Sequence, residues 1–518
     1  MSMIKSLILG SAAGLIAVSG AQAADLPVKA KAVEYVKICS LYGAGFYYIP
    51  GTDTCMKIGG YLRVDTTFNG GIFDQPAWNG NLGQQNRLRD YYAARSRLAL
   101  SIDTRTATAY GVVRTFGQAN FNLNSSTGEG PAAAGTQTLG VDLVFIQFAG
   151  FTFGKSASAY ATPWQGYPGN NSSYLLGGHD DVVGTNNIQY TAQFGNGVSG
   201  TIGLDDPYYG RTQLLNLGFV GAGTTNNPAT LITAGSNAYS GARSPDIVGN
   251  IRVDQAWGLF QISAAAHEVT GSYNFLTAGA ANNNSETFGH PDAKWGGSVM
   301  AALQIKNIPT GAGDDIKFDV SYAKGNTKNV LNTGPGFGLS GAPGFAMFGG
   351  STRADAYQSI GFGQAADGVF LPVAFGGTGD IKLVDAFGIR GAFNHNWDPY
   401  WSTSLFGSWS AVRYGGNALD LTTAKGQWCA NYVANKTAPS ADFSCNPDFN
   451  VSQLGLVTRW TPVANLTFSA EAMWFHLDQR MAGTINNPVG VVAPKPITRY
   501  EFRDQDAVSL NVRVQRNF

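Results

Sequence analysis

Apolar and polar side chains alternate along much of the chain, most clearly near its C-terminal end. Leu510, Val512 and Val514 are separated by the polar residues Asn511 and Arg513. A period of two places the two sets on opposite faces of a β-strand. The pattern therefore predicts a strand with one apolar face and one polar face.

The same alternation recurs at intervals and predicts sixteen strands. They span approximately 58–68, 90–103, 108–118, 139–149, 151–157, 186–194, 198–205, 246–255, 257–268, 295–307, 314–323, 382–396, 399–413, 449–461, 464–476 and 506–518. Short turns and long Gly/Asn-rich loops alternate between them. A transmembrane barrel has this asymmetry, because its short turns lie on the periplasmic side and its long loops face outward. We therefore predict a sixteen-stranded antiparallel transmembrane β-barrel rather than a soluble sandwich.

Charged residues fall on one parity of the predicted strands. Arg63 lies between Leu62 and Val64, and Arg97 precedes Leu98. An arginine on the lipid face near the bilayer midplane costs ~2–4 kcal/mol, whereas in an aqueous lumen it stays hydrated. Sixteen strands leave such a lumen open. The sequence thus predicts a water-filled pore.

The alternation leaves two stretches of the chain without a clear assignment. Residues 141–148 are apolar on both faces, which gives no parity and indicates contact with another protein surface. The long Gly-rich stretch 324–381 leaves the twelfth strand open, because 357–362 or 368–375 could join the wall or form an external hairpin.

Composition supports one large β architecture. Of 518 residues, 13% are charged and 12% aromatic, and 67 are glycine, which is typical of many strands joined by Gly-rich turns.

Composition also excludes two other classes of protein. Basic and acidic residues balance at 34 each with no basic run, so the chain has no positively charged surface of the kind that binds nucleic acid. No run of 18 apolar residues exists, which argues against a helical membrane protein.

The first residues are typical of an export signal. Lys5 precedes an apolar stretch, and Ala21 to Ala23 form a small-residue cleavage site, so we expect residues 1–23 to be removed. A membrane anchor is the alternative, but the apolar stretch is shorter than the ~20 residues needed to span a bilayer. We therefore expect an exported protein with an N-terminal segment over 24–57, followed by a barrel over 58–518.

The four cysteines form two local pairs. Cys39 and Cys55 are sixteen residues apart, and so are Cys429 and Cys445. In an oxidising compartment this spacing predicts two disulfides, each contributing ~3 kcal/mol by closing a short loop. A metal site would normally use closer cysteines and nearby histidines, so we predict no metal site and no cofactor.

Three stretches resemble a known family. Residues 36–61 are VKICSLYGAGFYYIPGTDTCMKIGGY, residues 147–154 are QFAGFTFG, and residues 191–197 are TAQFGNG. Together with the signal and the terminal aromatic Phe518, these resemble the general porins of alphaproteobacteria found in Brucella and the rhizobia. The resemblance implies a bacterial outer-membrane channel for passive diffusion of small hydrophilic solutes.

The resemblance further implies a homotrimer in which the third long loop, about 157–186, folds into the lumen and narrows it. The acidic pair Asp180 and Asp181 would then face basic residues of the wall and produce a transverse field. Those basic residues would be Arg63, Arg95, Arg97 and Arg114. The alternative is that both aspartates are simply solvated in a surface loop. The resemblance also implies that the barrel-assembly machinery reads Phe518 and that lipid and lipopolysaccharide surround the wall.

Three other functions compete with a general pore. A substrate-specific channel would need a binding track, but the assignable inward positions are mostly Arg, Ser and Asn. An outer-membrane enzyme is disfavoured, because the five histidines stand in no Ser/His/Asp or His/Glu metal arrangement. A structural or adhesive barrel is the third alternative, since loops such as 206–245 and 414–448 could bind a partner.

Overall fold

A computed structural model describes residues 37–518, except for 72–82, 84, 88, 126–135, 171–174, 219–233, 276–283, 332–343, 435–437, 487–494 and 497. The predicted signal over 1–23 lies outside these residues. No helix among the described residues is long and apolar enough to cross a membrane.

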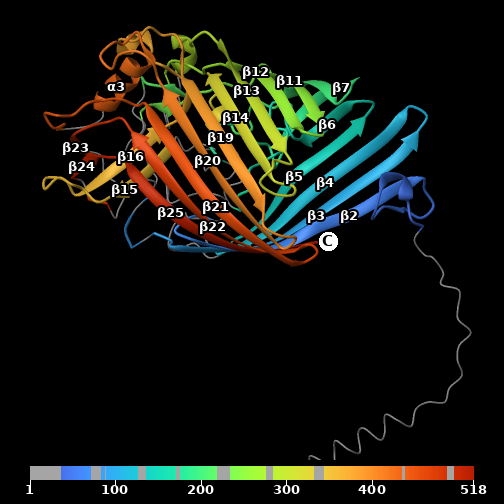
Figure 1. Ribbon diagram of the computed structural model, residues 1–518. Coiled ribbons are helices and arrows are strands. Elements are labelled where there is room, and N and C mark those ends of the chain that lie inside the picture. The colour runs from blue at the N-terminus through green and yellow to red at the C-terminus, as the bar shows by residue number, and fades with distance from the viewer. Residues whose placement is uncertain are drawn as a thin grey trace, which may run out of the picture.

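The chain folds into a closed antiparallel barrel of sixteen strands (Figure 1), as predicted. The strands are β2 (Thr54–Phe68), β3 (Tyr92–Thr108), β4 (Gly111–Asn124), β5 (Thr136–Phe148), β6 (Phe151–Ser156), β7 (Thr185–Gly195), β8 (Val198–Asp205), β11 (Asp246–Gln255), β12 (Gly258–Val269), β13 (Lys294–Lys306), β14 (Asp315–Lys324), β19 (Asp385–Asn396), β20 (Trp401–Arg413), β21 (Phe449–Val463), β22 (Leu466–Gln479) and β25 (Gln505–Asn517). Each strand pairs with the next, and β2 pairs with β25 from Tyr61↔Asn517 to Phe68↔Leu510, which closes the ring. The backbone groups of the wall are thereby hydrogen-bonded without a free sheet edge.

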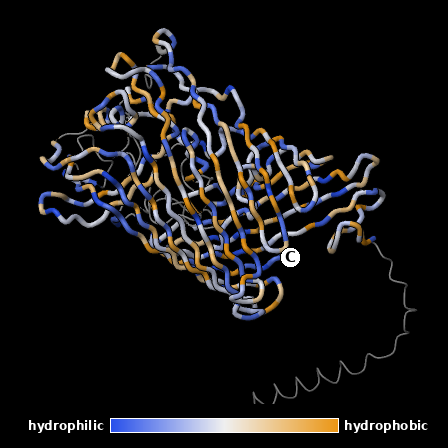
Figure 2. Tube along the Cα trace, turned by 45° about the horizontal axis from the view of Figure 1, so that its top comes forward, coloured by the Kyte–Doolittle hydropathy of each residue, from blue (hydrophilic) through white to orange (hydrophobic). Residues whose placement is uncertain are grey.

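Alternation sets the two faces of the wall. On β2, the side chains of Leu62 and Val64 are more than half exposed on the outside. Asp65 of the same strand points inward and is fully buried. Figure 2 shows this alternation as hydrophobic and hydrophilic positions that follow one another along the strands. The outward apolar residues form the surface that meets hydrocarbon.

A β-bulge explains why 141–148 gave no parity. Gln118 on β4 pairs with Leu143, whereas the next residue, Ala119, pairs with Val141, so Asp142 has no partner across the ladder. A bulge inserts one extra residue and reverses the alternation beyond it. Asp142 turns inward and accepts hydrogen bonds from Gln118 and Asn120.

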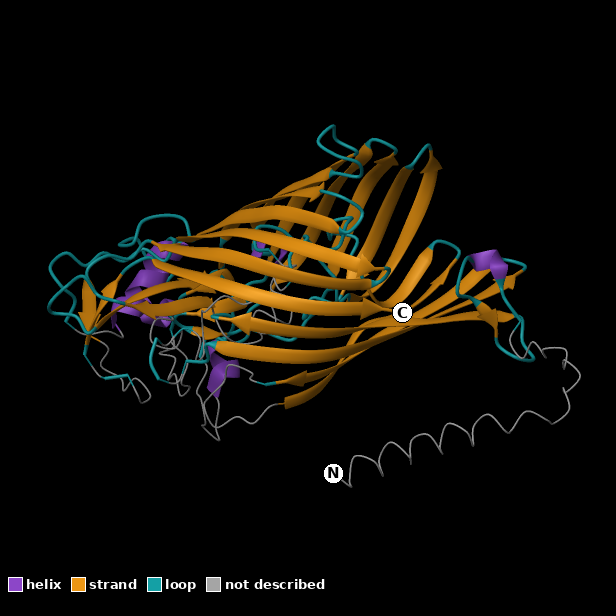
Figure 3. Cartoon of the chain, turned by 60° about the horizontal axis from the view of Figure 1, so that its bottom comes forward, coloured by secondary structure: helices purple, strands orange, loops and turns teal. Residues whose placement is uncertain are grey.

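The long loops on one side of the barrel form a folded cap (Figure 3). One small sheet contains β15 (Gly344–Gly349), β16 (Gln358–Gln364), β24 (Arg499–Phe502) and β23 (Thr484–Asn486), and the other contains β10 (Ser236–Asn237), β9 (Gln213–Asn216), β17 (Ala366–Phe370) and β18 (Lys382–Leu383). The open question about 357–362 and 368–375 is thereby answered, because β16 and β17 belong to the cap and not to the wall. Helix α3 (Ala424–Ala434) packs on these sheets, and the short helix α2 (Lys328–Leu331) lies against β14 and β19.

The cap shares a hydrophobic core with the inner face of the wall. The ring centroid of Phe345 of β15 lies 5.7 Å from that of Phe449 of β21, with the two rings tilted, and Trp428 of α3 is fully buried. Wall residues in this core point into the lumen near the outer ends of six strands. They are Ala323, Ala386, Val412, Val451, Phe475, Leu477 and Ala507. The cap therefore fills the outer lumen beside β14 to β25.

Both predicted disulfides are present. Cys39–Cys55 joins the N-terminal segment, including β1 (Tyr47–Tyr48), to the first residues of β2. Cys429–Cys445 ties α3 to the chain that leads into β21. The first bridge thus holds the N-terminal segment against wall strand β2, and the second closes a loop before β21.

The two faces of the wall predict opposite responses to charge. We expect Ile202→Arg on β8, where the side chain is 64% exposed to the outside, to lower the free energy of unfolding by about 2–4 kcal/mol. The matched control is its inward neighbour Thr201→Arg, which should cost only about 1 kcal/mol through the lost hydrogen bond to Thr191. Urea titration of folding into lipid vesicles measures both, and equal losses would contradict the assignment of faces.

Candidate pore constriction

One part of the wall presents a row of arginines to the lumen. They belong to β25, β2, β3 and β4, and they alternate with the outward apolar residues of those strands. The six are Arg63, Arg95, Arg97, Arg105, Arg114 and Arg513. Their inward direction follows from the period of two, which also places Asp65 and Asp103 on this face.

The two aspartates each bridge two of these arginines. Asp65 contacts Arg95 at 2.7 Å and also contacts Arg513. Asp103 lies 3.1 Å from Arg105 and 3.0 Å from Arg114. Each cluster therefore carries two positive charges against one negative charge, so the row keeps a positive excess.

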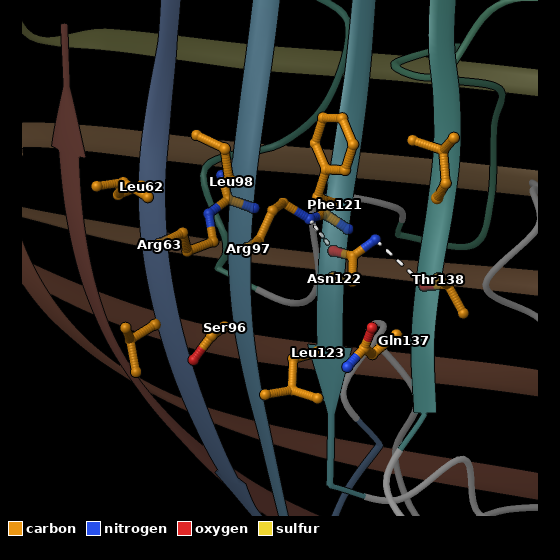
Figure 4. Close-up of a pocket in the computed structure, with 12 residues that line it drawn as sticks. Leu62, Arg63, Ser96, Arg97, Leu98, Phe121, Asn122, Leu123, Gln137 and Thr138 are labelled. Carbon is orange, nitrogen blue, oxygen red and sulfur yellow. Dashed lines mark hydrogen bonds between the residues drawn. The ribbon is translucent and has the colours of Figure 1, made fainter.

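Arg63 and Arg97 stand directly opposite each other across β2 and β3. Arg63 donates from Nε to Gln515 at 2.8 Å, and its guanidinium lies 4.5 Å from the Tyr61 ring. Arg97 donates from Nε to Asn122 at 2.6 Å, and Asn122 in turn donates to Thr138 (Figure 4). Within the described part of the chain, their hydrogen-bond partners are neutral. Like charges placed directly opposite in a sheet are unfavourable, so this pair is a site of unbalanced positive charge.

The loop between β6 and β7 runs along the opposite side of the lumen. Asn250 of β11 donates to Ala159 O at 2.6 Å, and Gln261 of β12 donates to Ala161 O at 2.8 Å. Farther along, the hydroxyl of Tyr167 donates to Asp319 of β14.

The tip of this loop reaches β21, β22 and β25, and β25 also carries Arg513 of the arginine row. Arg459 of β21 donates to Pro168 O, and the amide of Asn170 donates to Glu471 of β22. The Asn170 side chain also donates to Asn511 of β25 at 3.1 Å. Inward side chains from β11 to β25 thus hold the loop.

Arg390 of β19 is the centre of these contacts. It donates to Asp180 of the loop at 2.8 Å, to Asp319 at 3.0 Å and to Leu175 O at 3.2 Å. All three charged side chains are fully buried. Burying charges is costly unless they are paired and hydrogen-bonded, and this arrangement satisfies both conditions.

Glycine allows the loop to approach the wall at this point. Gly177 adopts a positive φ of 104°, which side chains with a Cβ rarely adopt. A Cβ on Gly388 of β19 would lie 2.1 Å from the Gly177 carbonyl oxygen. The backbones therefore meet directly, and Arg390 extends beside them.

The carboxylate of Asp181 does not contact Arg390. It accepts a hydrogen bond of 2.8 Å from the backbone amide of Ser158. Burial, aided by the nearby charge of Asp205, raises the pKa of Asp181 to about 7. This carboxyl fastens the end of the loop back to its beginning.

The predicted site residues separate into two groups. Arg63, Arg95, Arg97 and Arg114 occupy neighbouring strands of one wall. Asp180 and Asp181 were expected to face them, but Asp180 instead contacts Arg390, and both aspartates are 3% exposed. The physical reason is that a buried loop needs its own charges neutralised, and Arg390 lies beneath it. The role of Arg390 was not predicted from the sequence, although its inward parity in the middle of a strand indicated a charge inside the barrel.

A sixteen-stranded barrel with a polar lumen and an inserted loop defines an outer-membrane channel, and comparisons with known proteins identify its family. The chain matches the family described as "Porin subfamily" over residues 25–511 and belongs to that family. It is 29% identical to porin Omp2b of Brucella neotomae over 380 residues, covering 68% of this chain and 94% of the relative. It is 31% identical to porin Omp2b of Brucella suis over 336 residues, covering 58% and 81%.

Among solved structures, the outer membrane channel DcaP of Acinetobacter baumannii has a similar fold, with a TM-score of 0.53 at 12% identity over 91% of this chain and 99% of that chain. Membership of the porin family makes the protein a porin of the bacterial outer membrane and not an enzyme. It forms a water-filled channel for passive diffusion of small hydrophilic solutes and ions, as the family resemblance implied.

Removing the central arginine should release the loop. We expect Arg390→Gln to lower the free energy of unfolding by about 3–5 kcal/mol, because two buried carboxylates lose their cation. The control Arg252→Gln breaks a pair with Asp254 that is 34% and 45% exposed, and should cost at most about 1 kcal/mol. Urea unfolding in detergent micelles measures both; equal effects would mean that the buried cluster does not hold the loop.

Asp181 should make stability depend on pH. Its carboxyl binds a proton in the folded protein at pH values where the unfolded chain, with a pKa near 3.8, has released it. Its contribution to the free energy of unfolding is therefore present at about pH 4 and is lost as the pH rises to about 7. Asp181→Asn should flatten the fall in stability over this range, and the exposed Asp53→Asn should not. Denaturant midpoints measured at intervals between pH 4 and 8 test this prediction. The same dependence of the midpoint on pH in the two variants would contradict it.

Proposed function

We propose that the porin is a general, size-limited pore whose narrowest point lies between the arginine row and the loop over about 157–186. The observation that carries the proposal is that inward side chains from β11 to β25 contact this loop, whereas the arginines lie on β25 to β4. Solutes would pass between the two. Arg63, Arg97 and Arg114 would line the passage, Arg95 would hold Asp65, and Asp180 and Asp181 would fix the loop.

Three such barrels would form a homotrimer through the outer face of β2 to β5. Outward apolar side chains such as Leu62, Leu98 and Phe121 are exposed there. Ser96 lies among them and is exposed. A hydroxyl on the outer surface suits a protein partner better than hydrocarbon, and the apolar side chains around it suit a neighbouring subunit.

The remaining outer surface would contact lipid, and loop carboxylates would lie near lipopolysaccharide. Phe518 is 57% exposed at the end of β25, next to the strand β2 that closes the barrel. This position would make it accessible to the barrel-assembly machinery until closure is complete.

Swelling of proteoliposomes in neutral sugars of increasing size tests the proposal. A general pore gives rates that fall steadily with solute size and rise linearly with concentration. Saturation with one sugar would instead indicate a substrate-specific channel. Asp180→Asn, which loosens the loop, should admit larger sugars, whereas Arg252→Gln should leave the size limit unchanged. An unchanged limit in Asp180→Asn would contradict the assigned constriction.

A further inference from the structure

We propose that this pore favours small anionic solutes, and that Arg63 and Arg97 form the position where a carboxylate or phosphate group binds during passage. The proposal rests on the constriction proposed above and adds the class of solute.

Charges on the two sides of the passage differ in accessibility. The carboxylates beneath the loop are buried, with exposed fractions of 3% for Asp180, 0% for Asp319 and 3% for Glu471. Among the arginines opposite, Arg95 and Arg513 are buried beside Asp65. Arg105 and Arg114 are 29% exposed but paired with Asp103, whereas Arg63 and Arg97 are partly exposed and have neutral hydrogen-bond partners among the described residues. A passing ion interacts most strongly with charges that are exposed to the lumen and not already paired.

The loop itself offers no further negative charge. Between residues 157 and 184 the sequence contains two acidic residues, Asp180 and Asp181, and no lysine or arginine. Both acids are committed to Arg390 and Ser158. Half-buried Trp164 and Pro168 present neutral groups beside them. The passage therefore has one positive side and one neutral side, rather than the two opposite charges expected from the sequence.

The cap directs solutes toward the positive side. It packs on the inward ends of β14 to β25 through an apolar core that includes Phe475 and Leu477. Apolar packing of this kind excludes water and ions. Among the described residues, the aqueous route from outside consequently runs beside the other strands, which include β2 to β5 with their arginines.

Arg63 and Arg97 are suited to bind an anion. They stand directly opposite each other, and their described hydrogen-bond partners are the neutral Gln515, Asn122 and Tyr61. Guanidinium groups match the planar geometry of carboxylate and the oxygens of phosphate through paired hydrogen bonds. An anion between them would relieve the repulsion of the two cations, which favours binding.

Reversal potentials across a KCl gradient in planar bilayers test the selectivity. We expect chloride to be more permeant than potassium, most strongly at low salt, because the screening length is about 30 Å at 0.01 M and about 3 Å at 1 M. The double variant Arg63→Gln/Arg97→Gln should lose most of this preference. Arg252→Gln, which removes a lumen charge on the far side, should retain it. Cation preference in the wild type would overturn the proposal, as would unchanged selectivity in the double variant.

Inorganic phosphate tests the binding position. Added to a chloride-conducting channel, it should reduce the current with a saturable concentration dependence, and the double variant should require a several-fold higher concentration. Phosphate block of equal strength in the wild type and the double variant would show that Arg63 and Arg97 do not form the binding position. Swelling in a small neutral sugar should be clearly measurable in both proteins, which shows that each forms an open pore, so a failed pore is distinguished from a failed assignment of selectivity.

Discussion

The structure depends on a wall one residue thick that separates hydrocarbon from water. No water is available in the bilayer core to hydrogen-bond exposed backbone groups, so the sheet has to close on itself. The β2–β25 ladder performs this closure between residues more than 440 positions apart in the chain. Once the ring is closed, each inward side chain faces either water or inserted protein.

Two inserted parts contact the inner face of the wall. The loop after β6 is bound by inward side chains, and the cap packs on the outer ends of several strands. Each insertion is stabilised in a different way: the loop uses the buried Arg390 cluster and backbone hydrogen bonds, whereas the cap uses an apolar core around Trp428. The match to porin Omp2b of Brucella neotomae covers 94% of that protein but 68% of this chain.

Charge placement follows from the same separation of environments. A carboxylate beneath the loop is desolvated and has to find a cation, and Arg390 supplies one. An arginine facing the lumen keeps its hydration and can remain without a carboxylate, as Arg63 and Arg97 do among the described residues. The electrostatic character of the passage is therefore set by which charges the loop covers, more than by the overall composition, which is neutral.

The sequence determined the elements whose signal is local. Period-two alternation identified most of the sixteen wall strands, since a side chain on the wrong face would place charge in hydrocarbon, but it gave no parity for 141–148 and left the twelfth strand open. The cysteine spacing likewise predicted both disulfides. Tertiary structure decided the rest. The bulge at Asp142 depends on the register with β4, and the cap position of β16 depends on packing against β21 and β22. Asp180 meets Arg390, 210 residues away, only because the loop crosses the lumen. Alternation reports which face a residue occupies, but it contains no information on which distant side chain will cover that face.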